Sequence, residues 1–476
     1  MGQSTDDDRG GLTGSAAERT RSSFIGDLRT VTRSRGFRRL FATRLISQAG
    51  DGVFTAGLGG YVFFNATTYP NPASGAAAFA VLYLPYSLVG PFAGVFIDRW
   101  SRRQILVWSA VLRAAFVALT ATLVGSGVSG LPLYAASLLV LGVNRFFLAS
   151  LSAALPHVVP EDQLVMANGV SPTAGGIMAA IGGLAAIGVH VLTGGGQLGS
   201  AMTLAAAGCC YLLASAAAAT MRRDLLGPDR DPEAARVGGR AEFAAITAAL
   251  TSVAIGLVAG VRYVLRRRVP TATLGAIGAS KFLYGILLLM AILLYRNYFY
   301  AHNANVALGH FSSMVVVPGA VGYGAAALVT PPATARISKY AWISVAFAGA
   351  GIVTGALGPA FTQIGFLIVT LSVNLAAQSV AISAVTILQE EVADSYRGRV
   401  FAFYDMMSNV PFVIGAALSA LFMPLDGKSY AIIAGVAAGY VIASGCYWVV
   451  RRPSSGRPGE AGGTAMSSAP AQRRSS

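Results

Sequence analysis

The stretch Leu88–Leu106 reads LVGPFAGVFIDRWSRRQIL and places four charged residues between two apolar runs. The charged residues are Asp98, Arg99, Arg102 and Arg103. A helix needs about 20 mostly apolar residues to cross the hydrocarbon core of a bilayer, and each flanking run extends to that length. The stretch therefore predicts a short polar turn between two membrane-spanning helices.

The composition of the whole chain supports a membrane protein. Hydrophobic residues make up 54% of the 476 residues, and charged residues only 12%, whereas a soluble domain carries about a quarter charged residues. The 56 glycines suit helices that pack closely in lipid, because small residues let two backbones approach. We expect an all-α polytopic protein.

Apolar runs of spanning length recur along the chain and predict twelve transmembrane helices. The predicted spans are 41–63, 77–97, 105–126, 132–153, 167–193, 199–221, 271–295, 305–330, 341–358, 362–388, 400–424 and 429–450. They divide six and six around a polar stretch, and paired halves are typical of transporters with a binding site between two repeats. The predicted domains are a disordered tail (1–39), a first bundle (40–221), a linker (222–270), a second bundle (271–450) and a disordered tail (451–476).

The basic residues predict how the chain is oriented. With the N-terminus inside, 29 of the 35 lysines and arginines fall in cytoplasmic segments, which is the bias that cytoplasmic loops show. We expect both termini in the cytoplasm of a bacterium, with the chain in its inner membrane. The net charge of +15 is then explained by topology and anionic lipid, so no nucleic-acid partner is expected.

The segment Phe243–Val261 leaves an alternative open, because it is almost uncharged and would serve as a thirteenth span. Its apolar residues recur every three to four positions, and three arginines follow at 266–268. That pattern favours an amphipathic helix lying on the cytoplasmic surface of the membrane. An odd number of spans would instead export the arginines of the C-terminal tail.

The charged turn also carries a specific resemblance. Its residues Gly94, Asp98, Arg99, Arg102 and Arg103 match the G-x-x-x-D-R-x-x-R-R signature of the major facilitator superfamily. Pro91 and the run LQEEVADSYRGRVFAFYDMMSN, which begins at Leu388, resemble the branch of drug and metabolite exporters that includes macrolide efflux proteins. Ser101 replaces the usual glycine. The resemblance covers about 40–450 and implies two pseudo-symmetric six-helix bundles.

In such a fold this turn is expected to act as a cytoplasmic gate. Asp98 is placed to receive the free backbone N–H groups that begin the eleventh span, where the helix dipole favours an anion. Acidic residues of the second half would face Arg102 and Arg103. These ion pairs would hold the two halves together on the cytoplasmic side in the outward-facing state. The other residues assigned to this gate are Glu390, Glu391, Asp394, Arg397, Arg399 and Asp405. Alternatively, the arginines of the turn only enforce topology.

Ionisable residues inside spans are costly unless they meet a partner or a wet cavity. Four lie at similar depth near the midplane, counting about 1.5 Å per residue, and are the candidates for proton coupling: Asp51, Arg113, Arg145 and Lys281. The resemblance implies a proton-coupling arginine at Arg145 and a first-span acid at Asp51. A static ion pair among the first, third and fourth spans remains the alternative. Lys281 lacks an acid in its own half and is a candidate for substrate contact, whereas Asp405 is expected beside Arg399.

Polar residues on the first, tenth and eleventh spans are candidates to line the substrate cavity, although helix–helix hydrogen bonding accounts for them equally well. They are Gln48, Asn374, Gln378 and Asn409. No nucleophile with a base, phosphate-binding loop or metal-ligand spacing is found, so we expect neither an enzyme nor a cofactor nor a metal site.

The leading hypothesis is therefore a monomeric, proton-coupled exporter of a small amphipathic compound, such as an antibiotic or a secreted metabolite. A lipid-handling transporter that moves lysophospholipid is a second hypothesis. A transporter-shaped sensor or scaffold without turnover is a third. A midplane layer with more bases than acids indicates an anionic or zwitterionic cargo.

Overall fold

The computed structural model describes residues 34–64, 72–73, 75–83, 100–160, 164–222, 225–227, 240–301 and 303–450, and these ranges contain helices but no strand. The first helices are α2 (Arg35–Phe64), α4 (Arg102–Gly125), α5 (Leu131–Ala154), α6 (Leu164–Leu192) and α7 (Gly196–Ala219). Then come α8 (Arg240–Leu265), α9 (Arg268–Leu293), α10 (Ala304–Phe311) and α11 (Val317–Arg336). The last are α12 (Lys339–Leu357), α13 (Gln363–Glu391), α14 (Asp394–Phe422) and α15 (Tyr430–Val450).

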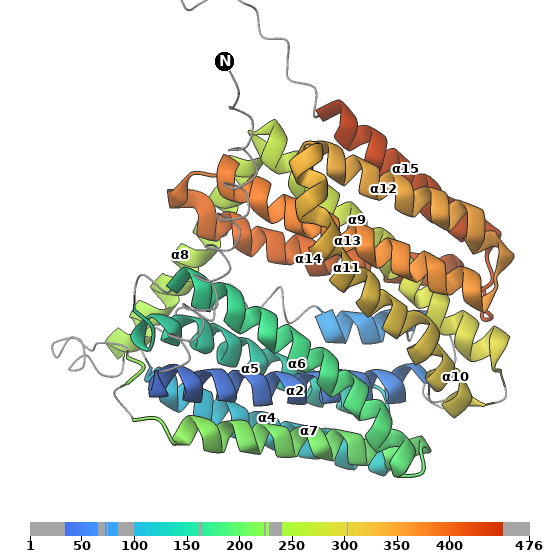
Figure 1. Cartoon of the computed structure of the whole chain (residues 1–476). Helices are drawn as coiled ribbons and strands as arrows, with labels where there is room; N and C mark the ends of the chain where they lie inside the picture. The colour runs from blue at the N-terminus through green and yellow to red at the C-terminus, as the bar shows by residue number, and fades with distance from the viewer. Residues whose placement is uncertain are drawn as a thin grey trace, which may run out of the picture.

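The helices pack into two groups that lie one above the other in Figure 1. In the first group α2 packs on α6 and α7, and α4 packs on α5 and α7. In the second group α9 packs on α13, α14 and α15, and α12 packs on α13 and α15. The predicted all-α fold with paired helical bundles is confirmed.

The predicted spans coincide with observed helices. Ten helices of the described ranges are long and apolar enough to cross a membrane. The helix α2 occupies the first predicted span, and the helical residues 75–83 cover the beginning of the second, whose remaining residues lie outside the described ranges. Most helices start two to six residues earlier than the apolar runs, and α2 begins at Arg35, inside the predicted tail. Polar residues extend these helices because an α-helix satisfies its own backbone hydrogen bonds beyond the hydrocarbon core.

Glycines set the closest helix crossings in both groups. A Cβ on Gly52 of α2 would collide with the carbonyl oxygen of Ala179 in α6, and a Cβ on Gly285 of α9 would collide with that of Phe412 in α14. Without a hydrophobic driving force between helices in lipid, such close packing contributes much of the attraction. The first and second groups therefore use the same kind of contact between corresponding helices.

Successive helices run in opposite directions, so every second helix begins at the same end of the two groups, and charged residues gather there. We call it the basic end, because α2, α4, α9, α12 and α14 begin there with residues such as Arg39, Arg103 and Lys339. The helix α10 lies at the opposite end, called the α10 end below (Figure 1).

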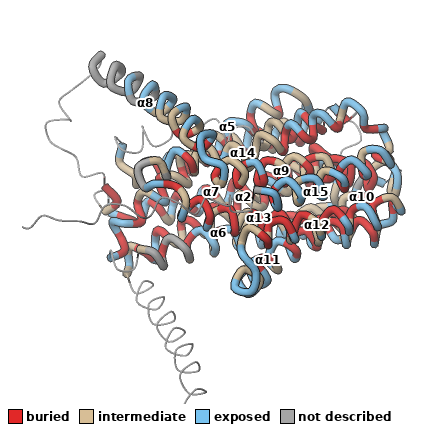
Figure 2. The backbone as a smooth tube through the Cα atoms, turned by 90° about the horizontal axis from the view of Figure 1, so that it is seen from above, coloured by how far each residue is buried: buried red, intermediate tan, exposed pale blue. Residues whose placement is uncertain are grey.

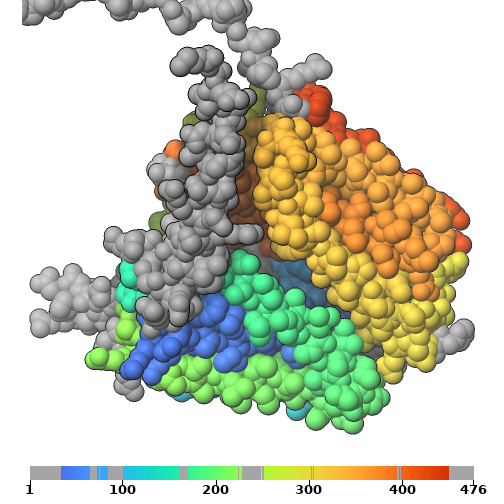
Figure 3. All heavy atoms as spheres, in the orientation of Figure 1, coloured from blue at the N-terminus to red at the C-terminus, as the bar shows by residue number. Residues whose placement is uncertain are grey.

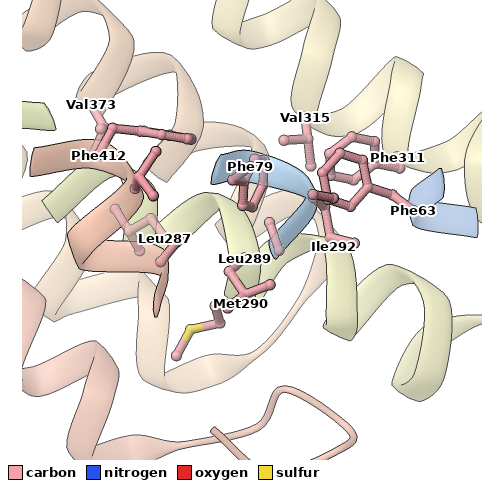
Figure 4. Packing of buried hydrophobic residues seen from close by; sticks show 14 of the residues in the cluster. Phe63, Phe79, Leu287, Leu289, Met290, Ile292, Phe311, Val315, Val373 and Phe412 are labelled. Carbon is pink, nitrogen blue, oxygen red and sulfur yellow. The ribbon is translucent and has the colours of Figure 1, made fainter. Parts of the chain in front are cut away.

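Aromatic residues join the two groups toward the α10 end. The ring of Phe64 lies 5.1 Å from that of Phe311, and Phe412 lies 5.1 Å from Phe79 and 4.5 Å from Tyr83. Figure 4 shows Phe63 and Phe79 of the first group among apolar side chains of the second. Nearer the viewer in Figure 3, the surface is hollowed between the green α6 and the yellow and orange helices.

The linker between the groups contains a helix, as the sequence predicted, and α8 spans Arg240–Leu265. The side chains of this helix are described mainly from Thr251 to Leu265. Figure 2 shows α8 running obliquely away from the helical groups at the end opposite α10. Its placement at the membrane surface remains a prediction.

Candidate functional site

A buried ion pair lies in the middle of the first group. Asp51 of α2 accepts from a guanidinium nitrogen of Arg113 in α4. The Arg113 side chain is 1% exposed, whereas the Asp51 side chain is 17% exposed. A buried cation needs such a partner, because an isolated charge in a low-dielectric interior costs several kcal/mol. The pair therefore joins α2 to α4 while its carboxylate stays partly accessible.

Three further side chains complete the cluster around this pair. Tyr211 of α7 donates its hydroxyl to Asp51 at 3.0 Å, and Asn144 of α5 donates an amide N–H at 3.4 Å. Arg113 donates to the hydroxyl of Ser47 at 2.9 Å, and its guanidinium carbon lies 3.7 Å from the centre of the Tyr211 ring. Hydrogen bonds to ionised groups are the stronger class, so the contacts of Arg113, Tyr211 and Asn144 fix the position of the Asp51 carboxylate.

The sequence places Asp51 at the depth of both Arg113 and Arg145 and links it with Arg145 for coupling, whereas in the structure its ion-pair partner is Arg113. The residue of α5 that reaches Asp51 is Asn144, which is adjacent to Arg145 in sequence. Arg145 instead acts electrostatically on Asp405 of α14, across the space between the two groups. Among the described residues Asp405 forms no ion pair with Arg399 in this conformation, and the charge that acts on it is that of Arg145. Arg399 lies against α8.

The second group places tyrosines beside the amides at the predicted cavity positions. Tyr284 of α9 faces Asn374 of α13, and Tyr323 of α11 faces Gln378 of α13. Asn374 donates to the backbone carbonyl of Thr370 at 2.9 Å, within its own helix. Asn409 donates to the backbone carbonyl of Asp405 at 2.8 Å, within its own helix. These hydrogen bonds of Asn374 and Asn409 are intrahelical, and a cavity role for the amides remains a prediction.

Two further candidates differ in their surroundings. Gln48 of α2 sits against Gly175 of α6, where a Cβ would collide with its side-chain oxygen. Lys281 of α9 makes no hydrogen bond or ion pair with any residue in the described part of the chain. Lys281 is partly buried, and a cation at this depth is costly unless water or a ligand meets it.

The structure describes only part of the predicted gate. Gly94, Asp98 and Arg99 lie outside the described residues, as do the side chains of Asp394 and Arg397. Arg102 and Arg103 have partners within the first group and its linker. Arg102 lies 3.2 Å from the ring of His157 and donates to the carbonyl of Leu226, and Arg103 donates to the carbonyl of Ala219 at 2.7 Å.

The acids of the second group are likewise occupied there. Glu390 pairs with Lys339 of α12. The hydroxyl of Tyr340 donates to Glu391 at 3.4 Å, and Arg267 donates to the backbone carbonyl of Glu391. A gate that joined these acids to the arginines of the first group would have to exchange the partners described here.

Sequence reasoning missed the uncharged members of both clusters. Ser47, Asn144 and Tyr211 complete the Asp51 site, and Tyr284 and Tyr323 lie beside the amides of the second group. Serine and tyrosine are common in membrane helices, so neither residue type stands out. A helical-wheel comparison would have found one signal, since Ser47 lies one turn from Asp51 on the same face of α2.

The fold and these intramembrane charges define a multi-pass membrane transporter with two related helical bundles. The chain is 34% identical over 407 residues to uncharacterised MFS-type transporters of Mycobacterium tuberculosis and Mycobacterium bovis, covering 84% of this chain and 88% of each relative. The chain therefore belongs to the major facilitator superfamily, as a multi-pass protein of a bacterial membrane. No family model matches the sequence.

Solved transporters share the fold at low sequence identity. The nucleoside transporter NupG is 14% identical with a TM-score of 0.63, covering 88% of this chain and 100% of that one. The peptide transporter POT in complex with sulfate is 13% identical with a TM-score of 0.62, covering 88% of this chain and 94% of that one. At these identities the likeness concerns the fold.

Proposed function

We propose that the protein is a proton-coupled exporter that moves a small amphipathic compound by alternating access. The observation that carries the proposal is the asymmetry of the Asp51–Arg113 pair, in which the cation is sealed and the acid is 17% exposed. A proton carrier must be reachable by water in at least one state, and its protonation must change a contact between helices. Asp51 meets both requirements.

The expected cycle follows from the contacts of this pair. Deprotonated Asp51 holds α2 against α4 through Arg113, and against α5 and α7 through Asn144 and Tyr211. Protonation removes the negative charge that Arg113 faces, which weakens the ties among these helices. Binding of the proton then biases one of two conformations, which is what coupling requires. The partners found at the basic end favour assigning the present conformation to a state open on that side.

The cargo site is inferred from polar and charged groups on the helices of both groups. Arg145 of the first group acts electrostatically on Asp405 of the second, Tyr284 and Tyr323 supply aromatic surface with hydroxyl groups, and Lys281 adds a cation. This combination of aromatic surface, polar groups and one additional positive charge fits an amphipathic anion or zwitterion. The names of the solved neighbours refer to nucleosides and peptides, and both are small polar solutes.

The decisive experiment measures Asp51→Asn in proteoliposomes with an imposed pH gradient. The amide keeps the shape of the acid but binds no proton, so gradient-driven transport should be lost while substrate binding and exchange persist. Ser47→Ala is the matched control, because it removes a hydrogen bond to Arg113 without removing the titratable group. Substrate is identified first by screening antibiotics, metabolites and lysophospholipids for stabilisation of the wild-type protein.

Two outcomes would contradict the proposal. Well-folded Asp51→Asn protein that still accumulates substrate in response to the pH gradient would exclude Asp51 as the carrier. Selective transport of lysophospholipid without any gradient dependence would favour the lipid-handling alternative.

A further inference from the structure

The helix α8 is fastened to the turn between α13 and α14 by stacked side chains. The rings of Tyr263 in α8 and Tyr396 in α14 are 4.3 Å apart and inclined by only 9°. Arg267 covers the outer face of Tyr263 at 4.7 Å, and Arg399 lies 5.4 Å from Tyr396. We call these four residues the clamp. Stacked rings and cation–π contacts each add attraction beyond buried area.

Backbone contacts reinforce the clamp at the same turn. The backbone N–H of Ala393, the residue before α14, donates to the hydroxyl of Tyr263 at 3.3 Å. Arg267 donates to the backbone carbonyl of Glu391, the last residue of α13, at 3.4 Å. The end of α8 therefore binds both sides of the turn from which α14 starts.

A glycine notch brings α8 close to the first turns of α14. A Cβ on Gly260 would lie 2.9 Å from the Cβ of Arg399, and one on Gly256 would lie 3.4 Å from its Nε. The two glycines are one helical turn apart and share a face of α8. The stem of Arg399, predicted from sequence to belong to the gate, occupies this notch.

The opposite face of α8 carries an exposed stripe. Ile255, Val258 and Leu265 are 65, 60 and 65% exposed, and they recur at three and seven residues, which places them on one side of the helix. Arg262 lies within the same stripe and is exposed, as are the arginines 266–268 that follow the helix. Apolar residues flanked by arginines are the pattern of helices that lie on anionic membrane surfaces.

We propose that α8 is a lipid-bound strap: its exposed stripe rests on the anionic surface of the bilayer, while its glycine notch and clamp hold the start of α14. The ligand of this surface is the anionic headgroup layer, recognised by the arginines, with the acyl boundary below it receiving the apolar side chains. The headgroup charge of the membrane thereby acts on the helix that carries Asp405 and Arg399. The inference requires membrane placement of the helices, which family membership provides, and does not depend on proton coupling.

The first experiment locates the stripe relative to lipid. The full chain, with Cys209, Cys210 and Cys446 replaced by serine, carries an environment-sensitive fluorophore on Val258→Cys and is reconstituted in vesicles of phosphatidylcholine with or without phosphatidylglycerol. We expect a blue-shifted, quencher-protected signal in anionic vesicles and a more aqueous signal in neutral ones. An aqueous signal in both would overturn the proposal.

The second experiment tests whether α8 transmits the influence of anionic lipid to the cytoplasmic gate. Spin labels on Ser152→Cys of α5 and Thr386→Cys of α13 report the distance between the two groups at the basic end. In the otherwise unaltered chain, anionic lipid should change the distribution of distances. In Gly260→Ala the response should shrink roughly ten-fold, since overpacking of a close contact separates α8 from α14.

The glycines provide matched controls. Gly398→Ala, one residue before Arg399, meets nothing within 4 Å and should respond to lipid as the unaltered chain does. The added methyl group of Gly256→Ala faces only the flexible end of Arg399. The lipid response of this variant should therefore lie between those of Gly260→Ala and Gly398→Ala. A full lipid response in well-folded Gly260→Ala would show that α8 does not transmit the headgroup charge and would refute the coupling. Transport is not used as a readout, so failure here is separate from failure of the proposed function.

Discussion

In the first helical group α2 crosses α6 at Gly52, and in the second group α9 crosses α14 at Gly285. The framework is thus repeated, but the centres differ. The first group encloses the ion pair of Asp51 and Arg113, whereas the second holds tyrosine–amide pairs and Lys281, which has no partner within the described ranges. One architecture therefore supports a self-neutralised charge cluster in one half and an uncompensated cation in the other. The difference suggests that the halves divide proton binding from cargo binding.

Two tyrosines make the contrast concrete. Tyr211 and Tyr440 are both 0% exposed. The hydroxyl of Tyr211 donates to Asp51 at 3.0 Å, whereas the hydroxyl of Tyr440 has no hydrogen-bond partner among the described residues. A buried hydroxyl without a hydrogen-bond partner lowers the stability of the folded state. The second half therefore contains a buried polar group that destabilises this conformation.

The largest effect should come from breaking the ion pair in the first half. Arg113→Leu leaves the carboxylate of Asp51 without its cation and should lower the free energy of unfolding by about 3 kcal/mol, toward the lower end of the range for buried pairs because the acid is partly exposed. Unfolding in detergent measures it. The double variant Asp51→Asn with Arg113→Leu should recover most of the loss, and no recovery would mean that packing rather than charge dominates.

A second comparison asks whether the two crossings are equivalent. Gly52→Ala and Gly285→Ala each direct a methyl group at a backbone carbonyl and should cost about 1–3 kcal/mol apiece, the usual range for overpacking. The controls Gly176→Ala and Gly275→Ala meet nothing within 4 Å and should be neutral or slightly stabilising, since alanine favours helix. A large loss of stability in only one half would show that the two helix crossings are not equivalent.

The tyrosines give a smaller and opposite pair of effects. Tyr211→Phe removes a hydrogen bond to a charged acceptor in a membrane helix and should cost about 1 kcal/mol. Tyr440→Phe removes an unpaired hydroxyl and should be neutral or stabilising. Thermal unfolding of the two variants beside the unaltered chain measures the difference, and equal losses would contradict the proposed contrast between the centres.

The smallest effect on stability is expected at Lys281. Lys281→Met keeps length and removes a cation that has no partner in the described residues, so the free energy of unfolding should stay the same or rise slightly. Binding of an anionic cargo should fall while binding of neutral analogues persists, as isothermal titration would show. A destabilised Lys281→Met protein would instead indicate that the lysine is structural.

The spans were predictable because membrane insertion imposes one long-range rule, an apolar run of sufficient length. Partners within the bundle were not predictable to the same degree. Depth alone placed Arg113 and Arg145 in one layer, but the direction of each side chain around its helix decides which of them reaches Asp51. The same limitation applies to Asp405, which is expected from sequence beside Arg399 and on which the charge of Arg145 acts. Helix rotation is set by packing, and it is not written in a hydropathy pattern.

The aromatic contact between the groups, where Phe412 meets Phe79 and Tyr83, has a thermodynamic consequence. Opening the protein at the α10 end must separate these rings and expose them to water. Exposure of apolar surface raises the heat capacity, so the enthalpy of opening increases with temperature. The equilibrium between the two conformations should accordingly follow a curved van 't Hoff plot, with the curvature reduced when Phe412 is replaced by a smaller side chain.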